Sequence, residues 1–401
     1  MDIHFINNKS DKLNINNKKI VINIQGLSYL EINKTIEEIS PLFPKTIKIK
    51  FIGIGEKESE IILLILDNYT FNYKNPRKLL LEKKFQPLIQ EVDDYKRITI
   101  SPNKVPKTMA EYFLKKIPKN YTFKKFPIKK KDRMFPLSSA VNQGSSHRAF
   151  FLHIFPRKIN PKYDNIFLIG KCVTFDSGGL DIKLKGLPNM KTDMAGSAIL
   201  IAVINLVHDT DKNIHLLIPI VENFIGSEAT LPGTVITTLS GKTVEITNMD
   251  GEGRLCIADS LEYFNKFLYK KNLKNPVIID IATLTANTKK ITCGVSFITT
   301  CNSAGKKYDD LLLKIGEEIA EYGDYLKLRE NYLDKLTSKV ADIKNSSDNC
   351  KAGFLIASAF INYFVNPKIP WMHIDIDSVA YVDEKVNSIG VNLLRNFILQ
   401  L

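Results

Sequence analysis

The chain has 401 residues, of which 44% are hydrophobic and 25% charged, and its formal net charge is +13 at pH 7. This balance excludes an intrinsically disordered chain, and the length suffices for one large globular domain and a smaller one. The longest apolar run, Ala198 to Ile204, reaches ten residues even when it is extended to Val207, so we expect a buried helix and no association with a membrane.

The N-terminal residues predict a small α/β domain without a secretory signal. The opening MDIHFINNKS lacks a basic segment followed by an apolar one, which a signal peptide would need. Residues 1–77 then alternate β-type runs with one helical pattern around Glu31 to Glu38. The β-type runs are KIVINI, TIKIKFIGI and EIILLIL.

A polar helix of mixed charge is predicted over residues 78–99, where it would connect two domains. Pro87 lies inside this helix and would kink it, because proline removes one backbone hydrogen bond.

The lysine-rich segment Lys124 to Lys131, with the sequence KKFPIKKK, raises the alternative of a nucleic-acid-binding protein. Clustered lysines neutralise phosphates, but the other lysines are spread over the whole chain and this segment has little aromatic interleaving. We interpret the segment as a solvated surface run. Nucleic-acid binding on a retained enzyme fold is the alternative function.

Residues 100–401 predict the main domain, which is of the α/β class. Apolar runs alternate with helical stretches, and continuous apolar strands are typical of a sheet buried on both faces. We therefore expect a central mixed, mostly parallel sheet between helices. The strands are NIFLIG, NIHLLIPIV and PVIIDIATLT, and the helices include AGSAILIAVINLVHD and RLCIADSLEYFNKFLYKK.

The five cysteines are scattered, odd in number and never spaced as Cys-x-x-Cys. This pattern argues against both a disulfide framework and a zinc knuckle. A reducing, cytoplasmic compartment is the expectation.

Acids and lysines follow the ends of the predicted strands. The strand NIFLIG leads to Lys171, and Asp176 follows on a Ser-Gly-Gly turn with Lys183 beyond it. Asp193 directly precedes the apolar helix that begins at Ala195, where a carboxylate would suit the helix N-terminus as a cap. Strand ends are where α/β sheets assemble their sites.

The segment TNMDGEGRL, Thr247 to Leu255, joins a predicted strand to a predicted helix. In an extended chain Asp250 and Glu252 would project to the same side and face one point. The same acids fit two other interpretations. One is a solvated turn. The other is a calcium loop that begins at Asn248 and ends at Asp259. Neither end residue is the usual one for such a loop, and a strand precedes it where a calcium loop needs a helix.

Four carboxylates cannot converge without cations, and two divalent ions would balance them. Oxygen-rich sites of this type suit zinc, manganese, cobalt or magnesium. The six histidines have no metal-binding spacing such as His-Glu-x-x-His.

These segments resemble the leucyl aminopeptidases of the cytosol aminopeptidase family. The family's Asn-Thr-Asp-Ala-Glu-Gly-Arg corresponds to Asn248 to Arg254, and its Gly-Lys-Gly-x-x-Phe-Asp-Ser-Gly-Gly to Gly170 to Gly179. Further similarities are LPGTV, ATLT, AGFLIASAF and WMHIDI. The resemblance implies hydrolysis of peptides at the N-terminal residue, preferably a hydrophobic, leucine-like one, in peptide catabolism.

The resemblance also implies the parts of an active site. Two metal ions, manganese or zinc with cobalt or magnesium possible, would be held by Lys171, Asp176, Asp193, Asp250 and Glu252, and a water bridging them would be the nucleophile. Lys183 would stabilise the tetrahedral oxygen, and Arg254 would hold a bicarbonate ion as general base. The backbone of Leu284 and Ala286 would align the peptide, and Met190 would line the first specificity pocket.

The N-terminal domain departs from the family, because the segment before the connector is about half the length expected. That domain supports a hexamer in the family, so the resemblance implies a homo-oligomer, hexameric as in the family. Inside the motifs, Met249, Gly251 and Cys172 replace the usual residues, but none of the three is an expected ligand.

Overall fold

The computed structural model describes residues 2–6, 13–15, 19–23, 46–52, 72–73, 78–269, 273–347, 349–382 and 384–401. The predicted helix around Glu31 to Glu38 and the strand EIILLIL lie outside these residues. The chain forms two compact units, Met1–Asp93 with Gly316–Glu321, and Asp94–Ile315 with Tyr322–Leu401.

The first unit contains a small, mostly parallel sheet. Its described strands have the order β2-β3-β1-β4-β5, and β2 is antiparallel to β3 whereas the other pairs are parallel. The strands are β1 (Asp2–Ile6), β2 (Leu13–Ile15), β3 (Lys19–Asn23), β4 (Thr46–Ile52) and β5 (Asn72–Tyr73). Helix α3 (Lys78–Ile100) contains Pro87.

The second unit is built on a sheet of nine described strands in the order β15-β14-β17-β13-β8-β10-β7-β6, with β9 also paired to β10. Parallel pairs predominate, and β6, β7 and the β14–β17 pair supply the antiparallel ones. This confirms the predicted mixed, mostly parallel sheet. The strands are β6 (Tyr121–Ile128), β7 (Ala149–Pro156), β8 (Asp164–Gly170), β9 (Cys172–Asp176), β10 (Lys212–Asn223), β13 (Val277–Ala282), β14 (Phe297–Cys301), β15 (Gly323–Tyr325) and β17 (Trp371–Asp375).

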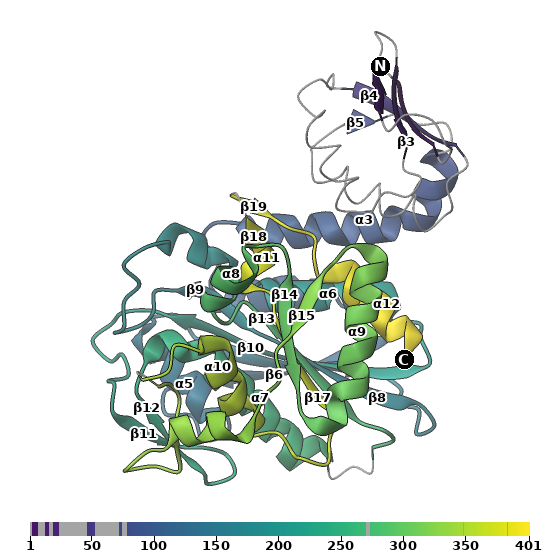
Figure 1. The fold of residues 1–401 in the computed structure, drawn as a ribbon. Helices are drawn as coiled ribbons and strands as arrows, with labels where there is room; N and C mark the ends of the chain where they lie inside the picture. The colour runs from purple at the N-terminus through teal and green to yellow at the C-terminus, as the bar shows by residue number, and fades with distance from the viewer. Residues whose placement is uncertain are drawn as a thin grey trace. The chain divides into compact units, whose positions relative to one another are not determined.

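Helices cover both faces of this sheet (Figure 1). Alternate side chains of strand β8 point to opposite faces of the sheet and meet different helices. On one face, Phe167 and Ile169 belong to the core cluster that includes Leu255 and Leu261 of α7. On the other face, a side chain at Gly170 would collide with Ser197 of α6. The helices of the unit are α4 (Pro106–Lys116), α5 (Pro136–Val141), α6 (Ala195–Val207), α7 (Glu252–Tyr263), α8 (Asn287–Thr292), α9 (Lys306–Ile319), α10 (Gly353–Asn362), α11 (Asp377–Ala380) and α12 (Val391–Gln400).

Helix α6 is the apolar run that the sequence predicts to be buried. The stretch Leu187–Val207, which includes it, has the length and composition of a membrane span, but 78% of its most apolar window is buried inside the protein. A core helix between a sheet and its neighbours has this property.

The carboxyl ends of β8, β9, β13 and β17 lie at one edge of the sheet, because these strands run parallel to one another or to a common neighbour. Ligand sites of open α/β sheets form at such an edge. Two small sheets complete the unit: β11 (Thr234–Thr237), β12 (Thr243–Ile246) and β16 (Ile343–Lys344) form one, and β18 (Tyr381–Val382) and β19 (Lys385–Val386) form the other.

Candidate metal centre and active site

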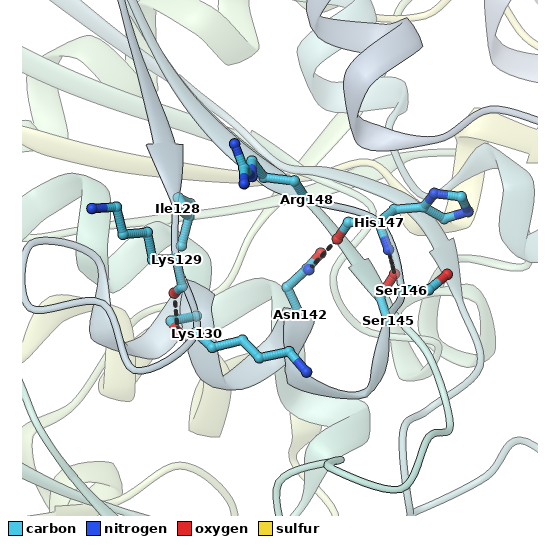
Figure 2. Close-up of a pocket in the computed structure, with 9 residues that line it drawn as sticks. Ile128, Lys129, Lys130, Asn142, Ser145, Ser146, His147 and Arg148 are labelled. Carbon is cyan, nitrogen blue, oxygen red and sulfur yellow. Dashed lines mark hydrogen bonds between the residues drawn. The ribbon is translucent and has the colours of Figure 1, made fainter.

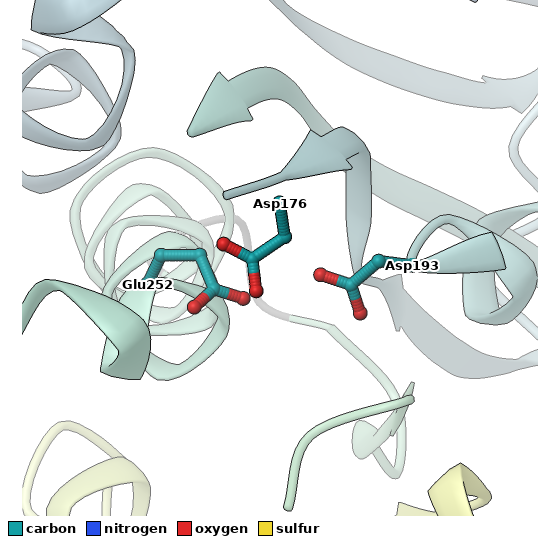
Figure 3. Close-up of side chains that lie close together, drawn as sticks. All are labelled: Asp176, Asp193 and Glu252. Atoms are coloured by element: carbon teal, nitrogen blue, oxygen red, sulfur yellow. The ribbon is translucent and has the colours of Figure 1, made fainter. Parts of the chain in front are cut away.

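Three buried carboxylates converge at this edge of the sheet (Figure 3). Asp176 is the last residue of β9, Asp193 follows the short helix Leu187–Thr192, and Glu252 is the first residue of α7. One oxygen from each lies within 4.8 Å of the others, and all three residues are buried. Asp193 Oδ2 and Glu252 Oε2 have no hydrogen-bond partner. Buried carboxylate oxygens without donors are free to bind a cation, so the cluster fits a divalent metal.

Lys171, in the link between β8 and β9, inserts its ammonium into this cluster. Its Nζ lies 2.7 Å from Asp193 Oδ1 and 2.7 Å from Glu252 Oε1, and it donates to the carbonyl of Thr283 at 2.6 Å. Burial alone would lower the pKa of Lys171, but the carboxylates of Asp193 and Glu252 hold the pKa well above its usual value. Without metal, Lys171 is therefore the cation that neutralises the centre.

The position of Asp193 in the sequence suggests that it caps helix α6, but it does not. The N-cap residue of the helix is Met194, and the side chain makes no capping hydrogen bond. Asp193 Oδ1 instead accepts from the Thr283 hydroxyl at 2.7 Å and pairs with Lys171. Burial raises the pKa of Asp193 well above its usual value, against the effect of Lys171.

Lys183 joins the buried cluster to the exposed acid of the motif. Its ammonium lies 2.8 Å from Asp176 Oδ2 and also donates to Asp250 Oδ1. Burial alone would lower the pKa of Lys183, but Asp176, the largest of the opposing charges, raises the pKa above its usual value. The side chain is 20% exposed, so this cation can be reached from solvent.

The expectation that the chain is extended between Asp250 and Glu252 is wrong. Residues Met249–Gly251 form a 3-10 turn and Glu252 begins α7. The turn separates the two acids, so that the Asp250 side chain is 39% exposed whereas that of Glu252 is 2% exposed. The Lys183 ammonium pairs with both Asp250 and Asp176 of the cluster.

Glycine is required next to Glu252 because the site is crowded there. A Cβ on Gly253 would lie 2.7 Å from Cε of Lys171 and 2.7 Å from Cδ1 of Leu284. Real Cβ atoms do not approach carbon atoms so closely, so a larger residue would push Lys171 out of its place between the carboxylates.

Arg254 is buried in the first turn of α7 and is fixed by Asn345. Its Nη1 donates to the Asn345 carbonyl at 2.9 Å, whereas its Nε has no partner. Burial lowers the pKa of Arg254. A guanidinium with an unused donor in a buried place can hold a small anion.

Asn345 is a residue that the sequence reasoning missed. It follows β16, and its Oδ1 accepts from the backbone N–H of Thr247 at 2.8 Å and of Asn248 at 3.2 Å, while its Nδ2 donates to the Asn248 carbonyl at 2.6 Å. The residue therefore fixes both the start of the motif and Arg254 near its end. No spacing in the sequence indicates it, because it lies 97 residues from Asn248.

Asn223 and Asp181 were missed as well. Asn223, at the end of β10, donates through Nδ2 to Asp176 Oδ1 at 2.8 Å and to the Met249 carbonyl at 3.0 Å. Asp181 Oδ2 accepts from the Met249 N–H at 2.6 Å. These two side chains tie the Asp176 turn to the Asp250 turn.

The three residues expected to contact substrate differ in exposure, and Leu284 lies beside Lys171 at Gly253. Met190 is half-buried in the short helix Leu187–Thr192, Leu284 is half-buried after β13, and Ala286 is exposed. Asp375, at the end of β17, accepts from the N–H of Leu284 at 3.1 Å and of Thr285 at 3.0 Å. Asp375 lies in the WMHIDI segment but was not assigned a role from the sequence.

The calcium-loop interpretation does not hold. Asp259, which would be the last ligand of the loop, is fully buried, and it accepts from the N–H groups of Leu137 and Ser138 at 3.3 and 2.6 Å. It therefore caps helix α5. Strand β12 also stands where a calcium loop needs its entering helix.

Comparison with known proteins identifies the fold and the motifs together. Residues 92–394 match the model of the cytosol aminopeptidase family, catalytic domain. The chain belongs to the cytosol aminopeptidase family. This membership confirms the resemblance on which the sequence expectations rest.

Three relatives named as probable cytosol aminopeptidases illustrate the family similarity. The protein of Protochlamydia amoebophila is 38% identical over 279 residues, which are 65% of this chain and 53% of the relative. The protein of Prochlorococcus marinus subsp. pastoris is 34% identical over 61% of this chain and 49% of the relative. The protein of Rickettsia canadensis is 35% identical over 64% of this chain and 52% of the relative. The chain thus spans about half the length of the curated relatives it matches.

Proposed function

We propose that the protein is a metal-dependent aminopeptidase that releases N-terminal, preferably hydrophobic and leucine-like, residues from peptides. The observation that carries the proposal is the buried convergence of Asp176, Asp193 and Glu252 around Lys171. Membership of the cytosol aminopeptidase family supports it.

The proposed ligands suit two divalent ions, preferably manganese or zinc. Asp176, Asp193, Glu252 and the amine of Lys171 would hold one ion, and Asp176, Asp250 and Glu252 the other. The unpaired oxygens of Asp193 and Glu252 support this assignment. Bound divalent ions supply a water acidic enough to attack a peptide carbonyl at neutral pH. Lys171 must release its proton to become a ligand.

Lys183 and Arg254 are the proposed catalytic side chains. The Lys183 ammonium lies within reach of solvent beside Asp176, and it would stabilise the negative oxygen that forms when the peptide carbonyl is attacked. Arg254 has an unused Nε donor in a buried place, which would hold bicarbonate as the general base that removes the proton of the attacking water.

The peptide would be positioned by the loop that follows β13. Asp375 accepts hydrogen bonds from the N–H groups of Leu284 and Thr285 and so fixes this loop. The Leu284 carbonyl and the backbone of Ala286 would then align the substrate. Met190 would line the pocket for the first side chain, because a flexible thioether adapts to leucine-like groups.

The family membership also supports proposals on the whole protein. We assign the chemistry to residues 100–401, with residues 78–99 as a connecting helix and residues 1–77 as a shortened N-terminal domain. A homo-oligomer, hexameric in the family, and a cytoplasmic location complete the proposal.

The test is hydrolysis of a leucine chromogenic amide by the full chain. We expect activity that a chelator abolishes and that manganese or zinc restores, and no cleavage of the same amide after N-acetylation, because the free amine is needed. Glu252→Gln should lower kcat by at least a factor of about 100, since it removes a charged ligand. Glu245→Gln is the matched control, because Glu245 accepts from the Ser338 hydroxyl outside the cluster. Activity that survives both the chelator and Glu252→Gln would exclude the proposal.

A further inference from the structure

Positive charge is concentrated in a part of the chain that the proposed function does not use. Residues 119–148 contain eight Lys and Arg residues and a single acid, Asp132. They include β6, which is an edge strand of the large sheet, and the loop that leads to helix α5. Residues 119–148 thus supply a large share of the net charge of +13.

This segment lines a cavity of about 260 Å³ (Figure 2). Its wall contains four side chains that are or can be cationic and no acid. The lining residues are Ile128, Lys129, Lys130, Ser139, Asn142, Ser145, Ser146, His147 and Arg148. The N–H groups of arginine and lysine are donors that proteins use for phosphate. Of the three serines, Ser139 and Ser145 already donate to the Lys129 carbonyl and the Glu222 carboxylate, which leaves the Ser146 hydroxyl.

Asp132 and Glu228 do not neutralise this wall, and a third acid, Glu222, is buried and contacts the wall through the Ser145 hydroxyl. The Asp132 carboxylate is already hydrogen-bonded to the backbone, because it accepts from the N–H groups of Lys129 at 3.1 Å and Met134 at 2.8 Å. Lys130 pairs with Glu228 at 2.6 Å, but both side chains are more than half exposed, and such surface pairs contribute little. Among the described residues, the side chains of Lys129 and Arg148 have no acidic partner.

Hydrogen bonds hold the residues at the floor of the cavity in place. Asn142 donates through Nδ2 to the His147 carbonyl at 2.7 Å, and its Oδ1 accepts from the N–H of Glu222 at 2.8 Å. Ser145 donates to the Glu222 carboxylate and accepts from the His147 N–H at 3.0 Å. A ligand would therefore meet a preformed floor, and binding would order the exposed side chains of Lys129, Lys130 and Arg148 above it.

The cations extend along a surface and do not converge on one point. Figure 2 shows Lys129, Lys130 and Arg148 pointing in different directions around the cavity. A second cavity of about 440 Å³ shares Ser139 with the first, and its charged lining residues are Lys131, Arg133 and Asp132. A single phosphate could not contact all these groups, but a short chain of phosphates could.

We propose that this cavity binds an oligophosphate group, that is, two or more phosphates in a chain. A diphosphate carries negative charge on two linked groups, which matches the separately directed cations Lys129, Lys130 and Arg148 of the wall, whereas a carboxylate carries a single charge on one group. The phosphate chain could be inorganic or part of a nucleotide. This site is separate from the carboxylate cluster and does not depend on the aminopeptidase function.

The experiment is calorimetric titration of the full chain with inorganic pyrophosphate, first as purified and again after treatment with a chelator, because oligophosphates also bind divalent ions. We expect one saturable site per chain at 150 mM salt under both conditions. Lys129→Ala and Arg148→Ala should each weaken binding at least about tenfold, as loss of one charge-assisted hydrogen bond does. Both side chains are exposed, so the substitutions should not disturb folding.

Lys368→Ala is the matched control. It removes the same charge from a different cavity, which is also lined by Asp164, and binding should stay within about twofold because screening limits distant charges. Adenosine diphosphate that binds at least as tightly as pyrophosphate, with the same dependence on Lys129 and Arg148, would assign a nucleotide as the source. Weaker binding of the nucleotide would assign an inorganic oligophosphate. Equal weakening by Lys368→Ala, binding that disappears with the chelator, or binding of single-stranded DNA without binding of pyrophosphate would overturn the proposal.

Discussion

Replacing Lys171 by methionine in the metal-free protein tests whether this ammonium neutralises the carboxylate cluster. Methionine has a similar length but no charge, so Asp193 and Glu252 lose the partner that lies 2.7 Å from each of them. The side chains of all three residues are less than a tenth exposed. Water therefore cannot replace the lost interaction.

The expected cost follows from burial. Removing one partner of a buried ion pair destabilises a protein by about 3–5 kcal/mol, because a buried charge is left unpaired. Lys183→Met is the matched control, since Lys183 lies among the same acids but is 20% exposed and contacts Asp250, which is 39% exposed. Solvent screening reduces its loss to about 1–2 kcal/mol.

The assay is urea unfolding followed by the fluorescence of Trp371. The chain has one tryptophan, and it is fully buried in β17 of the second unit, so the signal reports the unit that carries the cluster. Burial raises the pKa of Asp193 and of Asp176. A carboxyl group with a raised folded-state pKa destabilises the fold above that pKa, and the penalty decreases as the pH falls from the folded-state pKa to the unfolded-state pKa.

The cost of Lys171→Met should therefore be smaller at pH 5 than at pH 8. Manganese or zinc should also restore most of the lost stability at pH 8, because a divalent ion replaces the missing positive charge. Equal costs for Lys171→Met and Lys183→Met, or a cost for Lys171→Met that does not change with pH or metal, would refute this account of the cluster.

Three further changes test the surroundings of the site. Asn345→Ala removes the hydrogen bonds that fix Asn248, and we expect metal affinity, measured by competition with a chelating dye, to fall about 10–100-fold. Gly253→Ala places a Cβ 2.7 Å from Lys171, so kcat for a leucine amide should fall about 100-fold while the fold, measured by circular dichroism, is kept. For Asp259, burial raises the pKa to about 8, so the wild-type protein binds more protons folded than unfolded and loses stability between pH 5 and pH 8. Asp259→Asn should remove this loss, by up to about 1.4 kcal/mol per pH unit in urea unfolding.

Each of these outcomes has a contrary result that can be recognised. Unchanged metal affinity in Asn345→Ala would mean that the motif keeps its shape without the side chain. Full activity of Gly253→Ala would show that Lys171 can move without loss. A parallel pH dependence for Asp259→Asn and the wild-type protein would exclude Asp259 as the titrating group.

The sequence predicted the elements that carry the site, since their signals are local. The apolar runs that became β8, β10 and β13 and the helix Ala195–Val207 are recognisable from period and length alone. The acids at the ends of these elements could be named as candidates for the same reason. The extended geometry assigned to Asp250 and Glu252 was wrong, because a 3-10 turn of three residues leaves no periodic signal.

By itself, the sequence determined which residues stand at the ends of strands and which family motifs they form, because both depend on neighbours in the chain. Only the tertiary structure decided which ends meet. The contacts of Lys171 with Thr283, of Arg254 with Asn345 and of Leu284 with Asp375 join residues 112, 91 and 91 positions apart. Such contacts depend on the order of strands in the sheet and on the helices that cross it, and no local pattern encodes that order.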